Sequence, residues 1–174
     1  MAVRPILQLG NPLLWTVCDE ITDFGSPETN SLIEDLDHTL ADFRARNGFG
    51  RGIASPQIGV TKRAIFVRMH PAGFSGPMIN PWIVRESSER IELWDDCFSF
   101  PDLMVRLTRA RDILVEYHDA DGAVKSISAT GDFAELLQHE IDHLDGILAT
   151  DRAIDSQSFM TREEYLRRQK GRRS

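Results

Sequence analysis

The chain has little cysteine and no long hydrophobic run. Its 174 residues include only two cysteines, Cys18 and Cys97. This number excludes a disulfide-stapled scaffold and indicates a reducing, cytoplasmic environment. No apolar stretch approaches the roughly 20 residues that span a bilayer, and Met1–Pro5 is not followed by the apolar core of a signal peptide. Internal repeats are also missing, so we expect one globular domain with no membrane partner.

Charge is distributed unevenly along the chain. The net charge is −7, but residues 162–174 carry a local charge of +4, which leaves −11 for the rest. Thr161 and Glu164 have the spacing of a capping box, so this basic end is predicted to form a short helix. We therefore divide the chain into a catalytic domain, residues 1–160, and a basic helix or tail, residues 161–174. Such a tail suits contact with ribosomal RNA where nascent chains emerge, without sequence-specific nucleic-acid recognition; the alternative is a solvated end.

The most informative stretch is Gln138–Gly146, which contains His-Glu-x-x-His. On a helix, residues four apart lie on one face, so His139 and His143 are placed to bind one metal ion with Glu140 beside them. A metal ion that activates water next to a carboxylate is a hydrolytic arrangement. The motif therefore predicts a metal-dependent hydrolase, and the alternative is a structural helix with solvated histidines.

The helix that carries this motif is also predicted by its ends. Asp132 is expected to be its N-cap, with Glu135 three residues later completing a capping box, and Gly146 is expected to end it. An apolar stripe would pack against the core and leave the histidines at the core's edge. The stripe consists of Phe133, Leu137, Ile141 and Leu144.

Two histidines need a third protein ligand to make a catalytic site with an open position. Proteins with His-Glu-x-x-His-x-x-Gly-x-x-His place it where this chain has Ala149, so that class is excluded. Glu163, on the predicted C-terminal helix, has the spacing of a zinc peptidase ligand. A thiolate is the other option, and Cys97 has the better context because it lies between two predicted strands.

Two further motifs precede the histidines. The run Gly50–Val60 begins Gly-Arg-Gly-Ile-Ala-Ser-Pro-Gln, and Trp94–Pro101 contains Asp-Asp-Cys-Phe-Ser. With these three motifs in this order, the chain resembles the peptide deformylases, whose motifs are Gly-x-Gly-Leu-Ala-Ala-x-Gln, Glu-Gly-Cys-Leu-Ser and Gln-His-Glu-x-Asp-His-Leu-x-Gly. The resemblance extends over almost the whole chain and includes Ile6–Leu14 and Ile79–Pro81.

The middle motif departs most from the family pattern. Asp95 stands in place of Glu and keeps the charge, and Phe98 stands in place of Leu and keeps an apolar side chain. Asp96 replaces Gly and adds a carboxylate where the resemblance implies backbone close to substrate; Asp tolerates a positive φ there better than most residues. Glu135, one turn before His139, occupies a position where the family often has Arg or an aliphatic residue. These two acidic residues motivate the hypothesis that the substrate pocket is altered.

The resemblance implies a complete active site. Glu140 would act as general base and acid, while the Gln57 side chain and the Phe98 backbone N–H would hold the developing oxyanion. The residues expected at the substrate are Gly50, Gly52, Asp96, Glu135 and Arg109, the last near the mouth of the site. The metal ligands would be Cys97, His139 and His143.

The resemblance also implies the cofactor and the reaction. One divalent ion per chain is expected, Fe2+ in many members of the family and Zn2+ in some, whereas the donor set alone also suits Ni2+ or Co2+. The implied reaction removes the N-terminal formyl group from formyl-methionyl peptides of nascent proteins. The alternatives are a paralogue acting on another N-formyl or N-acyl substrate, a zinc peptidase using Glu163, and a metal-binding module without catalysis.

We expect an α+β fold in which antiparallel β-sheets surround a central metal-bearing helix, as the resemblance also implies. A helix is predicted over 29–47, ending at Asn47-Gly48. Residues 119–122 are predicted to form the turn of a β-hairpin. The predicted strands are 63–69, 78–85, 89–93, 113–119 and 123–129.

Overall fold

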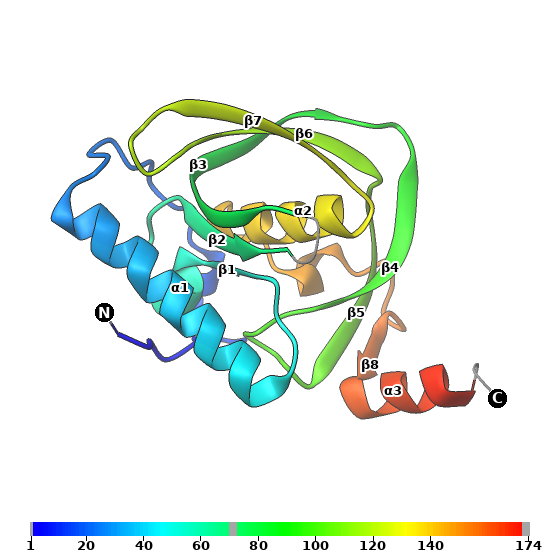
Figure 1. Ribbon diagram of the computed structural model, residues 1–174. Helices are drawn as coiled ribbons and strands as arrows, with labels where there is room; N and C mark the ends of the chain where they lie inside the picture. The colour runs from blue at the N-terminus through cyan, green and yellow to red at the C-terminus, as the bar shows by residue number, and fades with distance from the viewer. Residues whose placement is uncertain (1, 70–72, 172–174) are drawn as a thin grey trace.

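The computed structural model describes residues 2–69 and 73–171 (Figure 1). Its helices and antiparallel strands confirm the predicted α+β fold. The α-helices are α1 (Pro27–Asn47), α2 (Asp132–Leu144) and α3 (Arg162–Gly171), and the short 3-10 helices are η1 (Pro12–Trp15), η2 (Ser55–Ile58) and η3 (Ala149–Arg152). The strands are β1 (Gly52–Ala54), β2 (Ala64–Arg68), β3 (Ser75–Glu86), β4 (Arg90–Asp96), β5 (Leu103–Ala110), β6 (Asp112–His118), β7 (Val124–Thr130) and β8 (Phe159–Thr161).

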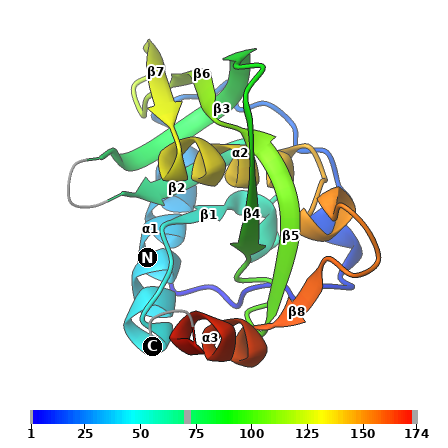
Figure 2. The same ribbon diagram turned by 90° about the vertical axis from the view of Figure 1, so that its right-hand side faces the viewer.

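The strands form two antiparallel sheets. The larger has the order β1-β2-β3-β6-β7, and the smaller has the order β4-β5-β8. Helix α2 lies between them, with β3, β6 and β7 on one side and β4 and β5 on another (Figures 1 and 2). It packs against β1, β7, β5 and η2, which places the metal-binding motif at the centre of the molecule.

Strand β2 separates two parts of the core. Successive residues of a strand point to opposite faces, so Ile65 and Val67 pack in the cluster around α2, whereas Ala64 and Phe66 pack in the cluster around α1. Burial on both faces fixes the register of β2 and of its edge neighbour β1. The segment that begins the first motif is thereby held at a defined distance from α2.

Glycines lie just outside both ends of helix α2. The prediction that Asp132 is the N-cap was wrong: Gly131 holds that position with φ 57°, and no side chain caps the helix. The Glu135 carboxylate is therefore not part of a capping box and pairs instead with Arg51. At the other end the C-cap is Asp145, and the glycine predicted to end the helix, Gly146, follows it with φ 69°.

The structure contains strands that the periodicity did not predict. The predicted helix over 29–47 is present and starts two residues earlier, and all five predicted strands are found with shifted ends. Strands β1, β5 and β8 were missed.

Thr161 caps α3 by accepting a hydrogen bond from the Glu164 N–H at 3.2 Å, as predicted, while Arg172 and Arg173 of the basic tail lie outside the described residues.

Within residues 2–69 and 73–171, no helix combines the length and the apolar character that crossing a membrane requires.

We predict that Gly146→Ala destabilises the fold. A Cβ at this position would lie 2.6 Å from the carbonyl oxygen of Trp15, a backbone atom that cannot move aside cheaply, and the left-handed conformation adds about 1–2 kcal/mol for a non-glycine residue. Thermal unfolding should show a lower Tm than in Gly25→Ala. Gly25 also has a positive φ, 72°, but an added Cβ there meets no atom within 4 Å. Equal losses of Tm in the two variants would contradict the close-approach argument.

Candidate active site

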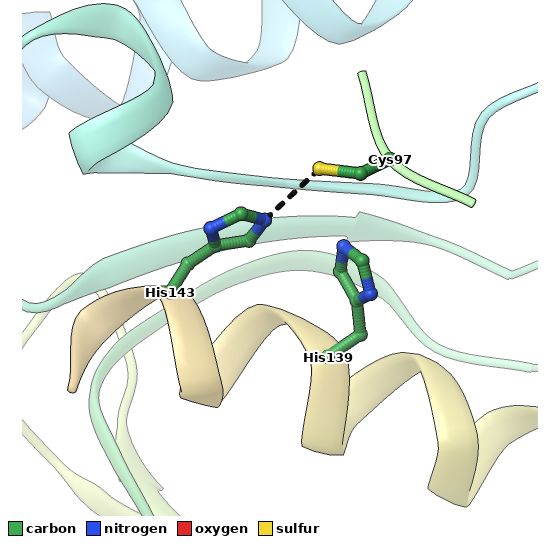
Figure 3. A group of neighbouring side chains, drawn as sticks. All are labelled: Cys97, His139 and His143. Atoms are coloured by element: carbon green, nitrogen blue, oxygen red, sulfur yellow. Dashed lines mark hydrogen bonds between the residues drawn. The ribbon is translucent and has the colours of Figure 1, made fainter. Parts of the chain in front are cut away.

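Three potential metal ligands meet above α2. His139 and His143 project from one face of the helix, and Cys97, from the turn after β4, faces them (Figure 3). The Cys97 Sγ and His143 Nε2 atoms are 3.2 Å apart, and ligand atoms of all three residues lie within 4.8 Å of one another. The structure thus brings together the three ligands that the resemblance implied.

The three residues fit a divalent metal ion. Zinc–sulfur and zinc–nitrogen bonds of about 2.3 and 2.1 Å in tetrahedral geometry put the ligand atoms roughly 3.5 Å apart, close to the spacing seen here. All three side chains are buried. The His143 Nδ1 atom and the Glu140 Oε2 atom are buried without a hydrogen-bond partner among the described residues. Buried polar atoms of this kind are uncommon outside functional sites.

Asp95 orients the first histidine. The His139 Nδ1–H donates to Asp95 at 3.0 Å, so the Nε2 atom is left for a metal ion. Arg109 donates to the same carboxylate from Nη2 at 2.9 Å and to Asp142 from Nη1 at 2.8 Å. Arg152 closes this series by pairing with Asp142. Asp142 therefore makes structural salt bridges with two arginines.

The prediction that Arg109 lies near the mouth of the site was wrong. Only 3% of its surface is exposed, and it is absent from the lining of the cavity at the metal ligands. Because its guanidinium is bonded to two buried carboxylates, it has no free face to offer a peptide carbonyl. Its observed place is behind Asp95, on the side away from the cavity.

The buried charges shift one another's pKa values. Burial alone would raise the pKa of Asp95, but His139 and Arg109 lower it well below its usual range. Burial likewise opposes protonation of His139, yet Asp95 raises its pKa. Burial and the neighbouring His139 lower the pKa of His143, which keeps that ring neutral and able to act as a ligand. Asp95 is therefore a permanent carboxylate that polarises His139.

Glu140 lies against the first motif. An added Cβ at Gly52 would be 2.6 Å from the Glu140 Oε1 atom, so only glycine leaves the carboxylate in this position. Burial raises the pKa of Glu140 to about 7, with Asp95 and Glu135 adding to the shift and His139 opposing it. A carboxyl with a pKa near neutrality is suited to accept a proton and to return it.

The Gln57 amide is fixed by a hydrogen bond to the residue that precedes η2. Its Oε1 accepts from the Ala54 N–H at 2.9 Å, which aims Nε2 at the Cys97 Sγ and the Ser99 Oγ, each 3.4 Å away. The side chain is buried and lines the cavity. Its long donor contacts leave Nε2 able to turn toward a substrate oxygen beside Cys97.

Phe98 combines a side chain in the core with a backbone at the cavity. Its ring stacks on Phe43 with 3.8 Å between centroids, and an added Cβ at Gly50 would lie 2.6 Å from that ring. No acceptor for the Phe98 N–H lies within the described parts of the chain. Stacking of the ring thus fixes the turn and holds this N–H next to Cys97.

Asp96 lines the cavity, but its charge is balanced. Its carboxylate accepts from Arg162 Nη2 at 2.5 Å, and the same guanidinium lies 4.0 Å from the centre of the Phe49 ring. Asp96 is the last residue of β4 and has no positive φ. Aspartate in place of the family's glycine therefore requires no unusual backbone conformation here. Its salt bridge with Arg162 connects α3 to the rim of the site.

Glu135 lines the same cavity and pairs with Arg51. The Arg51 Nη2 atom is 2.6 Å from the Glu135 Oε2 atom. Sequence reasoning missed Arg51, because the variable position of Gly-x-Gly carries no chemical signal by itself. It also missed Arg162. For either pair, the one available signal was that an acidic residue replaces the usual family residue, which calls for a basic partner elsewhere in the chain.

Glu163 is not part of the metal group. It is exposed on α3, and it belongs to neither of the metal-compatible clusters found among the described residues. The second such cluster, Asp95, Glu135 and His139, shares a histidine with the first. The geometry therefore favours the thiolate over the glutamate as third ligand.

Comparisons with known proteins agree with this site. The family model described as polypeptide deformylase matches residues 3–159. A relative from Nostoc sp., "Peptide deformylase 2", is 37% identical over 92% of each chain. A peptide deformylase from Rhizobium meliloti is 34% identical over 97% of this chain and 92% of its own.

Solved structures show the same architecture. A class I type b peptide deformylase from Acinetobacter baumannii, bound to Met-Ala-Ser, superposes with a TM-score of 0.79 at 30% identity, covering 87% of this chain and 98% of that one. The enzyme from Thermotoga maritima gives a TM-score of 0.80 at 28% identity, over 89% of this chain and all of the other. From the family match and the relatives above 30% identity along most of their length, we conclude that this chain belongs to the polypeptide deformylase family, whose members remove formyl groups from peptides with a bound metal ion.

Proposed function

We propose that the protein hydrolyses the formamide bond of N-formylated peptides, formyl-methionyl peptides of nascent proteins included, with the residues of the site in the roles below. One observation carries the proposal. Cys97, His139 and His143 form a metal-compatible group, and Glu140 lines a cavity together with Cys97 and His139. That cavity has a volume of about 230 Å³.

Strand β1 offers a place for the peptide. It is the edge strand of the larger sheet, and its first residue, Gly52, lines the cavity. An exposed strand edge binds an extended peptide through backbone hydrogen bonds. Gly50 and Gly52 keep side chains out of the path of that peptide. A formyl group at its end would then reach Glu140. The Acinetobacter relative binds the peptide Met-Ala-Ser, which supports a peptide site of this kind.

The chemistry follows from the donors and acceptors at this point. Glu140 accepts a proton from the attacking water and gives a proton to the leaving amine, so the C–N bond breaks to release formate and a free N-terminus. The Gln57 side chain and the Phe98 N–H donate to the formyl oxygen as negative charge develops on it. Each such donor contributes about 3 kcal/mol to catalysis in well-studied enzymes.

Cys97, His139 and His143 would hold the metal ion. When bound, a divalent ion lowers the pKa of water toward 7 and polarises the carbonyl group. Two imidazoles and a thiolate suit Fe2+, Zn2+, Ni2+ or Co2+, and we propose Fe2+ as the physiological ion. Asp95 and Arg109 position His139 from behind, because they fix its ring and tautomer.

Helix α3 is the proposed contact with the ribosome in the cytoplasm. Arg162 is engaged at the rim by Asp96 and is not available for RNA. The exposed cations of the described part of the helix are Arg167, Arg168 and Lys170, of which the two arginines share Glu164. None of the three lines the active-site cavity, so a phosphate backbone bound there would leave the active site open.

Formate release from formyl-Met-Ala-Ser by anaerobically prepared, iron-loaded protein tests the function. Wild-type protein should turn the peptide over, and Glu140→Gln should lower kcat by about 100-fold or more while keeping a full complement of metal, because the proton acceptor is lost but no ligand is. A variant that hydrolyses at the wild-type rate would favour a non-catalytic metal-binding module.

Metal analysis of three variants distinguishes the deformylase ligand set from that of a zinc peptidase. Cys97→Ala should lose the ion, whereas Glu163→Ala should retain one per chain. Cys18→Ala is the matched control, since Cys18 lies in the core and belongs to no metal-compatible group among the described residues. Retention of metal in Cys97→Ala together with its loss in Glu163→Ala would reverse the assignment.

The positioning role of Asp95 predicts a weaker metal site in Asp95→Asn. The amide keeps the size of the side chain but not the charge that holds His139, so metal affinity should fall about 10–100-fold. Titration with a competing chelator measures this change, with Tm followed in parallel. Asp155→Asn removes an aspartate from an exposed arginine pair and should leave metal affinity unchanged. Wild-type affinity in Asp95→Asn would refute the role.

A further inference from the structure

The cavity is lined by side chains other than those proposed to take part in the reaction. Beyond the metal ligands, Glu140 and Gln57, its wall contains the apolar residues Phe49, Phe98 and Leu136 and four charged side chains. The substrate group that follows the formyl group must meet this part of the wall. The charged side chains are Arg44, Arg51, Asp96 and Glu135.

Arg51 and Glu135 form the ion pair of α2 that lines the cavity. Glu135 lies one turn before His139, and its carboxylate accepts from the Arg51 Nη2 atom at 2.6 Å. The Arg51 Nη1 atom donates to the Asp132 carbonyl oxygen at 3.3 Å, at the start of the same helix. Side-chain exposure is 10% for Glu135 and 38% for Arg51. The pair is thus held on the helix and keeps one partly open edge.

The position of Arg51 is enforced by its neighbours. Gly50 is pressed against the Phe98 ring and Gly52 against Glu140, each so closely that an added Cβ would lie 2.6 Å away. The backbone on both sides of Arg51 is therefore fixed by groups of the active site. A side chain at residue 51 cannot withdraw from the cavity by a shift of this segment.

Both carboxylates of the wall have arginine partners, Glu135 with Arg51 in the lining and Asp96 with Arg162 from outside it. Arg44, which is exposed, has no carboxylate partner among the described residues. At the Arg51–Glu135 pair, a charged substrate group of either sign would lose its water and meet one like charge together with one opposite charge. A neutral group that both accepts from a guanidinium and donates to a carboxylate would match the pair. A methionine thioether is a weak acceptor and has no donor.

We propose that the Arg51–Glu135 pair makes the subsite next to the formyl group selective for a neutral side chain that carries both a hydrogen-bond donor and an acceptor, as a carboxamide does. The proposal rests on the deformylase function given above. Glutamine is nearly isosteric with methionine, so its amide would reach the pair at the depth of the thioether. Arg51 would donate to the amide oxygen, and Glu135 would accept from the amide nitrogen.

The direct test compares kcat/KM for formyl-X-Ala-Ser peptides with wild-type, metal-loaded protein. X is glutamine, methionine, norleucine, glutamate or lysine. Glutamine should be turned over at least as efficiently as methionine, and more efficiently than norleucine, glutamate and lysine. A tenfold or greater preference for methionine or norleucine over glutamine would overturn the proposal, and so would a preference for either charged side chain.

A double variant tests whether the pair is responsible. Arg51→Met/Glu135→Leu keeps the approximate volumes but removes the donor and acceptor, so the glutamine-to-methionine ratio of kcat/KM should fall about tenfold or more, which corresponds to about 1.4 kcal/mol. The matched control is Arg111→Met/Glu89→Leu. That pair has the same residue types and the same 2.6 Å separation but is exposed and outside the cavity, so the ratio should not change.

The outcomes separate this proposal from the function beneath it. An unchanged ratio in the cavity variant, with both substrates slowed equally, would show that the pair is only structural and would overturn the proposal while deformylation stands. If the double variant does not fold, Arg51→Met alone, at the more exposed partner, should still lower the ratio at least threefold, and an unchanged ratio there would likewise refute it. Absence of formate from every peptide with metal bound would instead refute the deformylase function.

Discussion

Helix α2 is buried along nearly its whole length, although more than half of its side chains are polar. A buried polar group costs free energy unless it has a hydrogen-bond partner, and the rest of the fold supplies those partners. The Gln138 amide bonds to both the N–H and the carbonyl of Ala110, at 2.9 Å each. Asp142 is held by Arg109 and Arg152. The α2 side-chain atoms left without a partner among the described residues are Glu140 Oε2 and His143 Nδ1, so the unsatisfied bonding capacity of the helix belongs to two residues of the candidate site.

This requirement explains why a second, small sheet accompanies the larger one. Strand β4 brings Asp95 and Cys97 to His139, and β5 brings Arg109 between Asp95 and Asp142. The two strands pair in register, Asp95 opposite Val105, and have a small apolar cluster of their own that includes Val105 and Leu107. Both this cluster and the charges on α2 fix their place in the molecule. A metal ligand, the carboxylate that orients it and the arginine that balances both therefore arrive on one hairpin.

The sequence predicted the metal-compatible group of Cys97, His139 and His143, with Glu140 beside it, because the spacing on α2 and the motif around Cys97 are local signals. The helix over 29–47 and the hairpin around 119–122 were predicted for the same reason. Strand β5 was missed, since its alternation is interrupted by the buried Arg109. The predicted place of Arg109 was wrong because its burial depends on Asp95 and Asp142, two carboxylates distant from it in sequence, and no local pattern reports those contacts. The Arg51–Glu135 pair joins residues 84 positions apart, and no local pattern reports such a contact.

The two glycines around Arg51 have an evolutionary consequence. Gly50 and Gly52 cannot change without displacing Phe98 or Glu140, whereas the side chain of residue 51 lies between them and pairs with Glu135. The proposed substrate preference is therefore encoded by the middle one of three consecutive codons. A lineage that carries this scaffold can alter the wall of its pocket by one substitution at that codon, with a compensating change one turn before the first histidine. Because Arg51 and Glu135 also act on the pKa of Glu140, the two changes must preserve that pKa for the reaction to continue. Duplicated copies of such a gene can diverge in substrate without first passing through an inactive protein.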